Sequence, residues 1–274
     1  MYSRKASSQA SAITGVITDP RDLKLPFKRI EEPTNLVEPN VLSMTDGSDG
    51  MLLVPPSNEV TARATKLEKT PNITNIPEFD RLVKDVEVEI LLKAGNNIST
   101  DDIIPAGTQV LPYWSNIPKV AEFAFEGVDQ GYAQRARAMR EAKKHHAIVA
   151  GNNYGQGSSR ENAAVAPRFL GLQLVIARSF ARIHWQNLVN FGVLPLTFVA
   201  PSDYDRMKLG DTIRISDLAN ALPANEEING TVDGWREPVK LRHSLSPRQI
   251  EVLLAGGAIN WLRERKQAAH LSGA

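Results

Sequence analysis

The stretch that decides the fold runs from residue 145 to residue 162 and reads HHAIVAGNNYGQGSSREN. It opens with a short apolar run that contains Ile148 and Val149, which predicts a buried strand. A glycine-rich loop follows. Ser158 and Glu161 then show the S-x-x-E spacing of a capping box, which predicts a helix N-terminus at the serines. A strand, a glycine-rich loop and a helix in this order indicate an α/β fold.

The loop has the properties of an anion site. A helix N-terminus carries unpaired N–H groups and partial positive charge, and Arg160 adds a planar guanidinium that suits a carboxylate. Three interpretations are open: a tight capped turn, a phosphate loop, or a carboxylate site with a serine that moves a proton. The dinucleotide pattern G-x-G-x-x-G fails because Arg160 takes the place of its last glycine. The P-loop pattern fails because no Lys precedes Ser158.

The flanking sequence repeats the strand–helix alternation. Strands are predicted at 86–92, 145–150, 172–177 and 193–198, and helices at 162–170 and 179–191. Gly171 closes the first of these helices and Gly192 the second. Strand–helix–strand spacing of this kind predicts parallel pairing with right-handed crossovers.

Further elements are predicted on both sides of this core. Helices are predicted at 119–125, 133–144, 246–255 and 258–265, and short strands and turns at 209–215 and 231–234. The third helix begins with a capping box at Ser246. The basic helix 133–144 is interpreted as a solvated face rather than an RNA site, because no aromatic residues are interleaved for base stacking. His145, His146 and His184 are interpreted as structural.

Residues 1–80 lack strong periodicity and contain many prolines. The predicted elements there are a short helix at 6–17 and a short strand at 51–54. This region is either a disordered leader or a segment that wraps over a partner surface.

Composition excludes several classes of protein. The 274 residues have a net charge of +1, 42% hydrophobic and 23% charged residues, which argues against nucleic acid or an anionic membrane as a partner. No run of about 18 apolar residues predicts a membrane span. The chain has no cysteine, so it can form neither a disulfide nor a thiolate metal site. A cytoplasmic location is expected, with the mitochondrial matrix as the alternative.

Several strings resemble the mobile C-terminal "swivel" domain of the aconitase family. The string YGQGSSRE at 154–161 is similar to its signature, NISTDDIIPAG at 97–107 to its opening motif, and ARSFARIH at 177–184 to a third motif. Residues 11–23 resemble the end of the family's third domain, and 71–73 and 77–80 its linker to the swivel domain. The resemblance favours the wrapping interpretation of residues 1–80, and it implies a swivelling β/β/α domain over 81–274.

The function that the resemblance implies is the isomerisation of citrate and isocitrate through cis-aconitate, as in the tricarboxylic acid cycle. Ser158 is then the catalytic base, and Asp101 is a second catalytic residue that orders the neighbours of Ser158. Ser159, Arg160 and Thr100 are then substrate-binding residues. From the residues alone, the favoured interpretation is that Thr100 and Asp101 accept backbone N–H bonds in a turn.

The family's iron–sulfur cluster implies a partner. The family holds a 4Fe-4S cluster with three cysteines, so a large subunit or the first three aconitase domains must hold it here, and this chain binds no metal itself. Alternatives are a subunit of a related dehydratase for isopropylmalate or homoaconitate, or an RNA-binding regulatory relative. Trp114 departs from the family pattern, which usually has Arg at this position to bind a substrate carboxylate.

Overall fold

The computed structural model describes residues 4–24, 35 and 55–272. The chain divides into two compact units, Met1–Lys66 and Leu67–Ala274. The described parts of the first unit contain α1 (Arg4–Thr14), the 3-10 helix η1 (Pro20–Leu23) and α2 (Glu59–Ala64). The helix expected at 6–17 is therefore present but begins and ends earlier. The strand expected at 51–54 lies outside the described residues.

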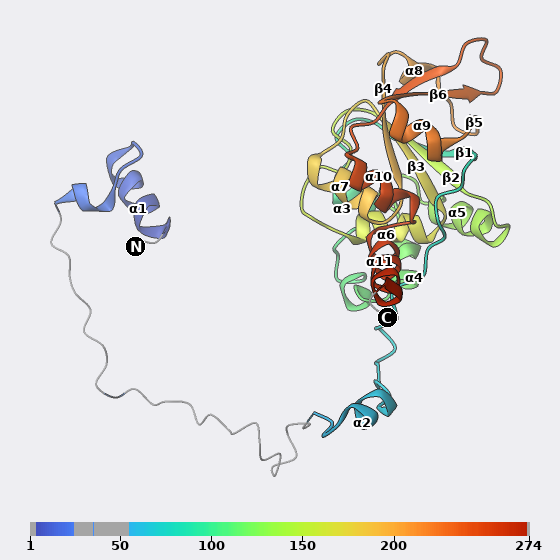
Figure 1. Ribbon diagram of the computed structural model, residues 1–274. Helices are drawn as coiled ribbons and strands as arrows, with labels where there is room; N and C mark the ends of the chain where they lie inside the picture. Colours follow the sequence, from blue (N-terminus) through green and yellow to red (C-terminus); the bar gives the residue numbers. More distant parts are fainter. Residues whose placement is uncertain (1–3, 25–34, 36–54, 273–274) are drawn as a thin grey trace. The chain divides into compact units, whose positions relative to one another are not determined.

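The second unit is built on a closed barrel of seven strands in the order β1-β2-β3-β4-β7-β6-β5 (Figure 1). The strands are β1 (Val86–Lys93), β2 (His146–Ala150), β3 (Leu172–Ala177), β4 (Leu194–Phe198), β5 (Thr212–Ile215), β6 (Glu227–Val232) and β7 (Val239–Arg242). Strands β1 to β4 pair in parallel, which confirms the predicted core. Strands β5, β6 and β7 are antiparallel and close the barrel against β1 and β4.

Helices cover the parallel strands, with α5 beside β1 and α7 beside β4 (Figure 1). The helices of this unit are α3 (Thr100–Ile103), α4 (Ile117–Val120), α5 (Tyr132–Glu141), α6 (Asn162–Phe169), α7 (Arg182–Asn190), α8 (Asp203–Arg206), α9 (Leu218–Ala224), α10 (Pro247–Leu254) and α11 (Ala258–Ser272), with 3-10 helices η2 (Leu111–Tyr113) and η3 (Ala121–Phe123). No helix among the described residues is long and apolar enough to span a membrane.

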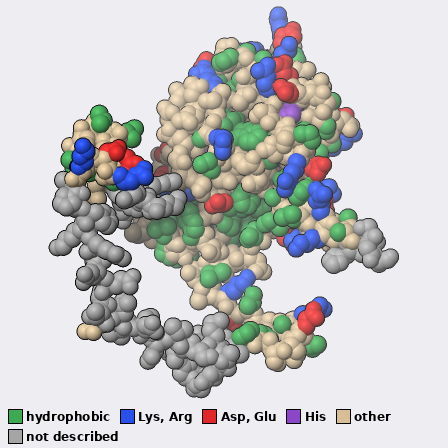
Figure 2. All heavy atoms as spheres, turned by 60° about the vertical axis from the view of Figure 1, so that its left-hand side comes forward, with side chains coloured by type: hydrophobic (Ala, Val, Ile, Leu, Met, Phe, Trp, Pro, Cys, Tyr) green, Lys and Arg blue, Asp and Glu red, His purple; other side chains and the backbone are tan. Residues whose placement is uncertain are grey.

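Two buried clusters explain why β2 and β3 carry no exposed residue. One cluster takes apolar side chains from all seven strands and so fills the barrel. The other joins β2 and β3 to α5, α6 and α7, with Tyr132, Ile148 and Leu188 fully buried. Strands buried on both faces read as continuous apolar runs. Charged side chains of both signs instead gather over the end formed by β5, β6 and β7 (Figure 2).

The helix after the central loop begins later than the S-x-x-E spacing predicts. α6 begins at Asn162, and its N-cap, Glu161, makes no side-chain capping bond, so the capping box expected at Ser158 is wrong. Ser159 and Arg160, which a helix capped at Ser158 would contain, lie in the loop instead. By contrast, the capping box at Ser246 is present and starts α10 at Pro247.

Other helices also begin or end at residues that differ from the predicted ones. α7 begins at Arg182 rather than at residue 179, because Phe180 is in a β-bridge with Tyr154. The helix expected at 133–144 ends at Glu141, and the one expected at 119–125 is split between α4 and η3. Strand β7 is absent from the sequence-based prediction, since four residues are too few for a clear alternation.

Residues 71–80, which we call the strap, lie along the second unit as an extended segment. Ile73 forms a parallel bridge with Ser115. Further on, Asn260 donates a hydrogen bond to the Phe79 carbonyl at 2.8 Å, and Arg168 donates one to the Asp80 carbonyl at 2.9 Å. The strap is thus fixed to its own unit mainly through its backbone, and the wrapping of residues 1–80 over a partner surface stays a prediction. The predicted division at residue 80 stays a prediction.

Candidate active site

The central loop, residues 151–160, lies where the parallel strands β1, β2 and β3 end at their carboxyl ends. Ligands of open α/β sheets bind at this edge because loops from several strands converge there. Backbone hydrogen bonds hold the loop on two sides. Asn97 donates its backbone N–H to the Asn152 carbonyl at 2.7 Å, and Tyr154 donates its own to the Ser179 carbonyl at 3.0 Å. The three strings that resemble the family therefore meet in one place.

Gly155 allows the loop to lie directly on α7. A Cβ atom at this position would fall well inside van der Waals contact with the His184 ring, and the φ of 81° disfavours any L side chain. The buried rings of Tyr154 and His184 pack edge to face with centroids 5.3 Å apart. Burial lowers the pKa of His184 to about 4, so its ring is neutral at physiological pH. This supports the structural interpretation of His184.

Thr100 and Asp101 begin the short helix α3, but neither caps it. The cap is Ser99, which forms a capping box with Asp102. Asp101 nevertheless accepts the backbone N–H of Ala106 at 3.4 Å, which is part of the turn role expected from the residues alone. Thr100 donates its backbone N–H to the Gln156 carbonyl at 2.8 Å, and its side chain is buried next to Gly157. Its hydroxyl has no hydrogen-bond partner among the described residues.

Asp101 and Arg160 form an ion pair that joins the opening motif to the central loop. The guanidinium binds both carboxylate oxygens, with the Nη2–Oδ2 contact at 2.9 Å. Arg160 also donates to the Ile104 carbonyl at 3.3 Å, and its side chain is 19% exposed against 62% for Asp101. The hydrogen bond from Arg160 holds the pKa of the Asp101 carboxyl below its usual value. The pair therefore fixes the direction of a half-buried guanidinium while leaving it open to solvent on one side.

Ser158 and Ser159 lie on the open side of the loop and are exposed. Among the described residues, neither hydroxyl has a hydrogen-bond partner in the protein. The structure thus places two free hydroxyls directly before a fixed guanidinium. Hydroxyl and guanidinium donors together are suited to a carboxylate ligand.

Asn162 is a site residue that the sequence-based prediction missed. It is buried at the first turn of α6 and donates from Nδ2 to the Trp114 carbonyl at 3.1 Å. This bond holds the loop that carries Trp114 against the helix that follows Arg160. The strap holds the same loop from its other side, since Asn72 donates to the Pro112 carbonyl at 3.0 Å. The sequence signal was a polar residue at the start of an otherwise apolar helix.

The surroundings of His146 support its structural interpretation. The His146 ring is buried and lies 2.7 Å from the Tyr132 hydroxyl, and burial lowers its pKa to about 3. The arginines of the basic helix α5 are engaged: Arg135 pairs with Asp129, and Arg137 with Glu122. These pairs fit the interpretation of α5 as a solvated face.

No metal centre is assembled by the described part of the chain, where no three His, Asp or Glu side chains come together as ligands. An iron–sulfur cluster needs thiolates, and the whole sequence contains no cysteine. The residues of this chain therefore do not fit such a cluster.

The sequence and the fold are similar to those of known proteins. Residues 119–201 match the family model described as the aconitase C-terminal domain. A probable mitochondrial aconitate hydratase of Dictyostelium discoideum is 33% identical over 202 residues, which is 66% of this chain and 26% of that protein. The mitochondrial homocitrate dehydratase of Saccharomyces cerevisiae is 30% identical over 203 residues, which is 65% of this chain and 26% of that protein. The chain thus spans about a quarter of the length of these relatives.

A solved structure extends the comparison to the fold. The 3-isopropylmalate dehydratase (leuD) of Methanocaldococcus jannaschii matches with a TM-score of 0.56 and 29% identity, covering 69% of this chain and 99% of that one. The seven-stranded barrel agrees with the swivelling β/β/α domain expected from the sequence. The chain belongs to the aconitase C-terminal domain family.

Proposed function

We propose that this chain is the swivel part of an aconitase-type hydro-lyase, either a small subunit or the C-terminal part of a longer enzyme. The proposed reaction is the reversible isomerisation of citrate and isocitrate through cis-aconitate. The observation that carries the proposal is the Arg160–Asp101 pair held beside the exposed hydroxyls of Ser158 and Ser159. The relatives named as aconitate hydratase and homocitrate dehydratase support a hydroxy-tricarboxylic acid as substrate.

Each site residue has a proposed role that follows from its place. Ser158, as an alkoxide, removes the proton α to a substrate carboxylate, and Arg160 stabilises that charge and binds a carboxylate. Ser159 donates a hydrogen bond to the substrate. Asp101 keeps the guanidinium oriented through its two contacts, and Thr100 supports the loop at Gly157.

A Ser158 hydroxyl cannot act as a base without help, because its ordinary pKa lies far above neutral. Among the described residues, no His or Lys side chain forms a hydrogen bond with it. We therefore propose that the active site is completed by a cysteine-bearing partner subunit or by further domains, which would also hold the 4Fe-4S cluster. Several relatives are mitochondrial by name, which supports the matrix as the proposed location.

A second candidate substrate is an acid with an apolar group in place of one carboxylate, as in an isopropylmalate dehydratase. The solved leuD structure and the half-buried Trp114 favour it, since an indole can donate one hydrogen bond but cannot neutralise a carboxylate. The test is Trp114→Arg in the assembled enzyme, assayed on citrate and on isopropylmalate. A shift of kcat/KM toward citrate supports the role of Trp114, and an unchanged ratio contradicts it.

The proposed function itself is tested by kinetics of the complete enzyme. Ser158→Ala should lower kcat strongly and leave KM nearly unchanged, because a base acts on the barrier. Arg160→Lys should raise KM and lower kcat, because a bidentate charge-assisted contact contributes roughly 1.5–3 kcal/mol. Ser202→Ala, at an exposed position before α8, is the control. Wild-type kinetics for both site variants would contradict the proposal.

A further inference from the structure

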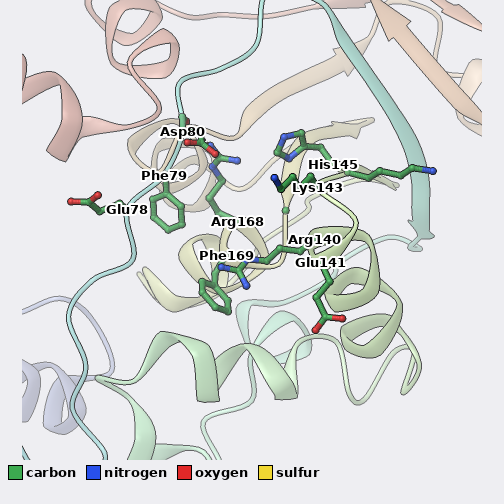
Figure 3. Close-up of a pocket in the computed structure, with 11 residues that line it drawn as sticks. Glu78, Phe79, Asp80, Arg140, Glu141, Lys143, His145, Arg168 and Phe169 are labelled. Carbon is green, nitrogen blue, oxygen red and sulfur yellow. Dashed lines mark hydrogen bonds between the residues drawn. The ribbon is translucent and has the colours of Figure 1, made fainter.

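A cavity lies at the opposite end of the parallel strands from the Ser158 loop (Figure 3). Its volume is about 660 Å³, and it lies between the strap and the ends of α5 and α6. Its wall includes His145 and Gly171, which directly precede β2 and β3. The cavity is therefore separated from the candidate active site by the length of a strand, about 16 Å for five residues.

Arg168 forms the floor of this cavity and is only 4% exposed. Its Nη2 donates to the Asp80 carbonyl at 2.9 Å, and its Nε has no hydrogen-bond partner among the described residues. Burial lowers the pKa of the guanidinium to about 10, so the group is still charged at neutral pH. The charge of Asp80 partly compensates this cation. The unfilled buried Nε donor is still costly unless an acceptor meets it.

Three further cations line the cavity, together with the acidic residues Glu78, Asp80 and Glu141. Arg140, Lys143 and Lys144 are in its wall, and none of them forms an ion pair with a described residue. Arg140 is held over the Phe169 ring at 4.1 Å. The Asp80 side chain lies beside Arg168, whereas the carboxylates of Glu78 and Glu141 point away from it (Figure 3).

His145 adds a neutral polar group to the same wall. Its Nδ1 is buried and has no partner among the described residues. Burial, reinforced by the charge of Arg168, lowers the pKa of the ring, which therefore carries no charge at neutral pH.

Basic residues at a helix C-terminus have a simpler explanation, because they complement the helix dipole. That explanation covers Arg140 and Lys143 at the end of α5. It does not cover the unfilled Nε of Arg168 at the floor, nor the orphaned Nδ1 of His145, nor a cavity of this size between them.

We propose that this cavity binds a small organic phosphate, with the phosphate facing Arg168 and Lys143 and the apolar part against Phe79 and Phe169. A phosphate dianion matches several cations better than a single carboxylate does, and lysines bind phosphate as point charges. The cavity is far larger than inorganic phosphate needs and falls in the range of small-molecule sites, about 300–1,000 Å³. The site is independent of the function proposed for the Ser158 loop.

The test is a thermal-shift and calorimetric titration of the full chain with phenyl phosphate, inorganic phosphate and benzoate at constant ionic strength. Phenyl phosphate should raise Tm saturably, inorganic phosphate should bind more weakly, and benzoate should bind weakest. Lys143→Ala, at an exposed position, should weaken phenyl phosphate binding about two- to fivefold, the effect of an exposed charged contact. Lys240→Ala, exposed on β7, should bind as the wild type does.

Arg168→Met provides a second, stronger variant, and its folding is checked by circular dichroism. If the folded Arg168→Met chain binds phenyl phosphate as tightly as the wild type, the proposed site is wrong. Equal affinity in Lys143→Ala, equal binding of benzoate, or no saturable shift at millimolar phenyl phosphate would each overturn the proposal as well.

Discussion

At the residue scale, Gly155 shows how closely the central loop is packed. Gly155→Ala should destabilise the domain by about 3 kcal/mol, because the new methyl group overlaps the His184 ring at a left-handed φ. The free energy of unfolding in urea measures this. Gly234→Ala is the matched control, since Gly234 has a similar φ of 79° but open space around it. The free energy of unfolding should fall by only about 1 kcal/mol in that control. Equal decreases in both variants would mean that the overlap with His184 adds no cost.

The buried histidines predict how stability depends on pH. The pKa values of His184 and His146 are lowered to about 4 and about 3 in the folded protein, whereas the unfolded chain takes up these protons near pH 6.5. Their contribution to stability is therefore complete above pH 6.5 and is lost as the pH falls toward 4. Each ring contributes a slope of roughly 1.4 kcal/mol per pH unit in that window.

His184→Gln isolates one of these slopes. Unfolding in urea at several pH values should show a flatter dependence between pH 6.5 and 4 in the variant, whatever its stability at neutral pH. If the free energy of unfolding changes with pH equally in wild type and variant between pH 6.5 and 4, the fold does not hold His184 neutral.

At the element scale, two S-x-x-E/Q sequences behave differently, and this can be measured. Ser246→Ala should cost about 1 kcal/mol, because Ser246 caps α10 in a capping box. Ser158→Ala should change stability by less than about 0.5 kcal/mol, the usual effect of an exposed position, because α6 begins at Asn162. Similar losses in urea unfolding for both variants would mean that Ser158 caps α6 after all.

The helices and strands also show which local sequence patterns are enough to predict an element. Strands β2 and β3 were predicted to within a residue, because both of their faces are buried and their sequences are continuous apolar runs. The start of α7 was not predicted, because the pairing of Phe180 with Tyr154, far away in sequence, overrides the helical pattern there. Pairing of this kind leaves no mark in the local sequence.

At the scale of the whole molecule, the two compact units predict that residues 67–274 fold alone. A chain that begins at Leu67 should keep the far-ultraviolet circular dichroism and the cooperative unfolding of the second unit. A chain that begins at Asp85 should unfold at lower urea, because it lacks the strap carbonyls that bind Arg168 and Asn260. Equal midpoints for the two shortened chains would show that the strap adds no stability.

The absence of cysteine from the sequence also leads to a prediction for the whole molecule. The purified chain should hold no iron–sulfur cluster and turn over no citrate, since it has no cysteine. Activity should appear on addition of a cysteine-bearing partner with a reconstituted cluster. A cluster absorption spectrum from the chain alone would contradict this expectation.

The sequence by itself determined the parallel core, the glycine-rich loop and the candidate residues Ser158, Ser159 and Arg160, because each is a local pattern of neighbouring residues. The resemblance to the aconitase family added Thr100 and Asp101. Only the tertiary structure showed that Asp101 meets Arg160, that Asn162 holds the Trp114 loop, and that Arg168 is buried under the strap. These contacts join residues far apart along the chain, and their geometry depends on how the barrel closes, which no local pattern encodes.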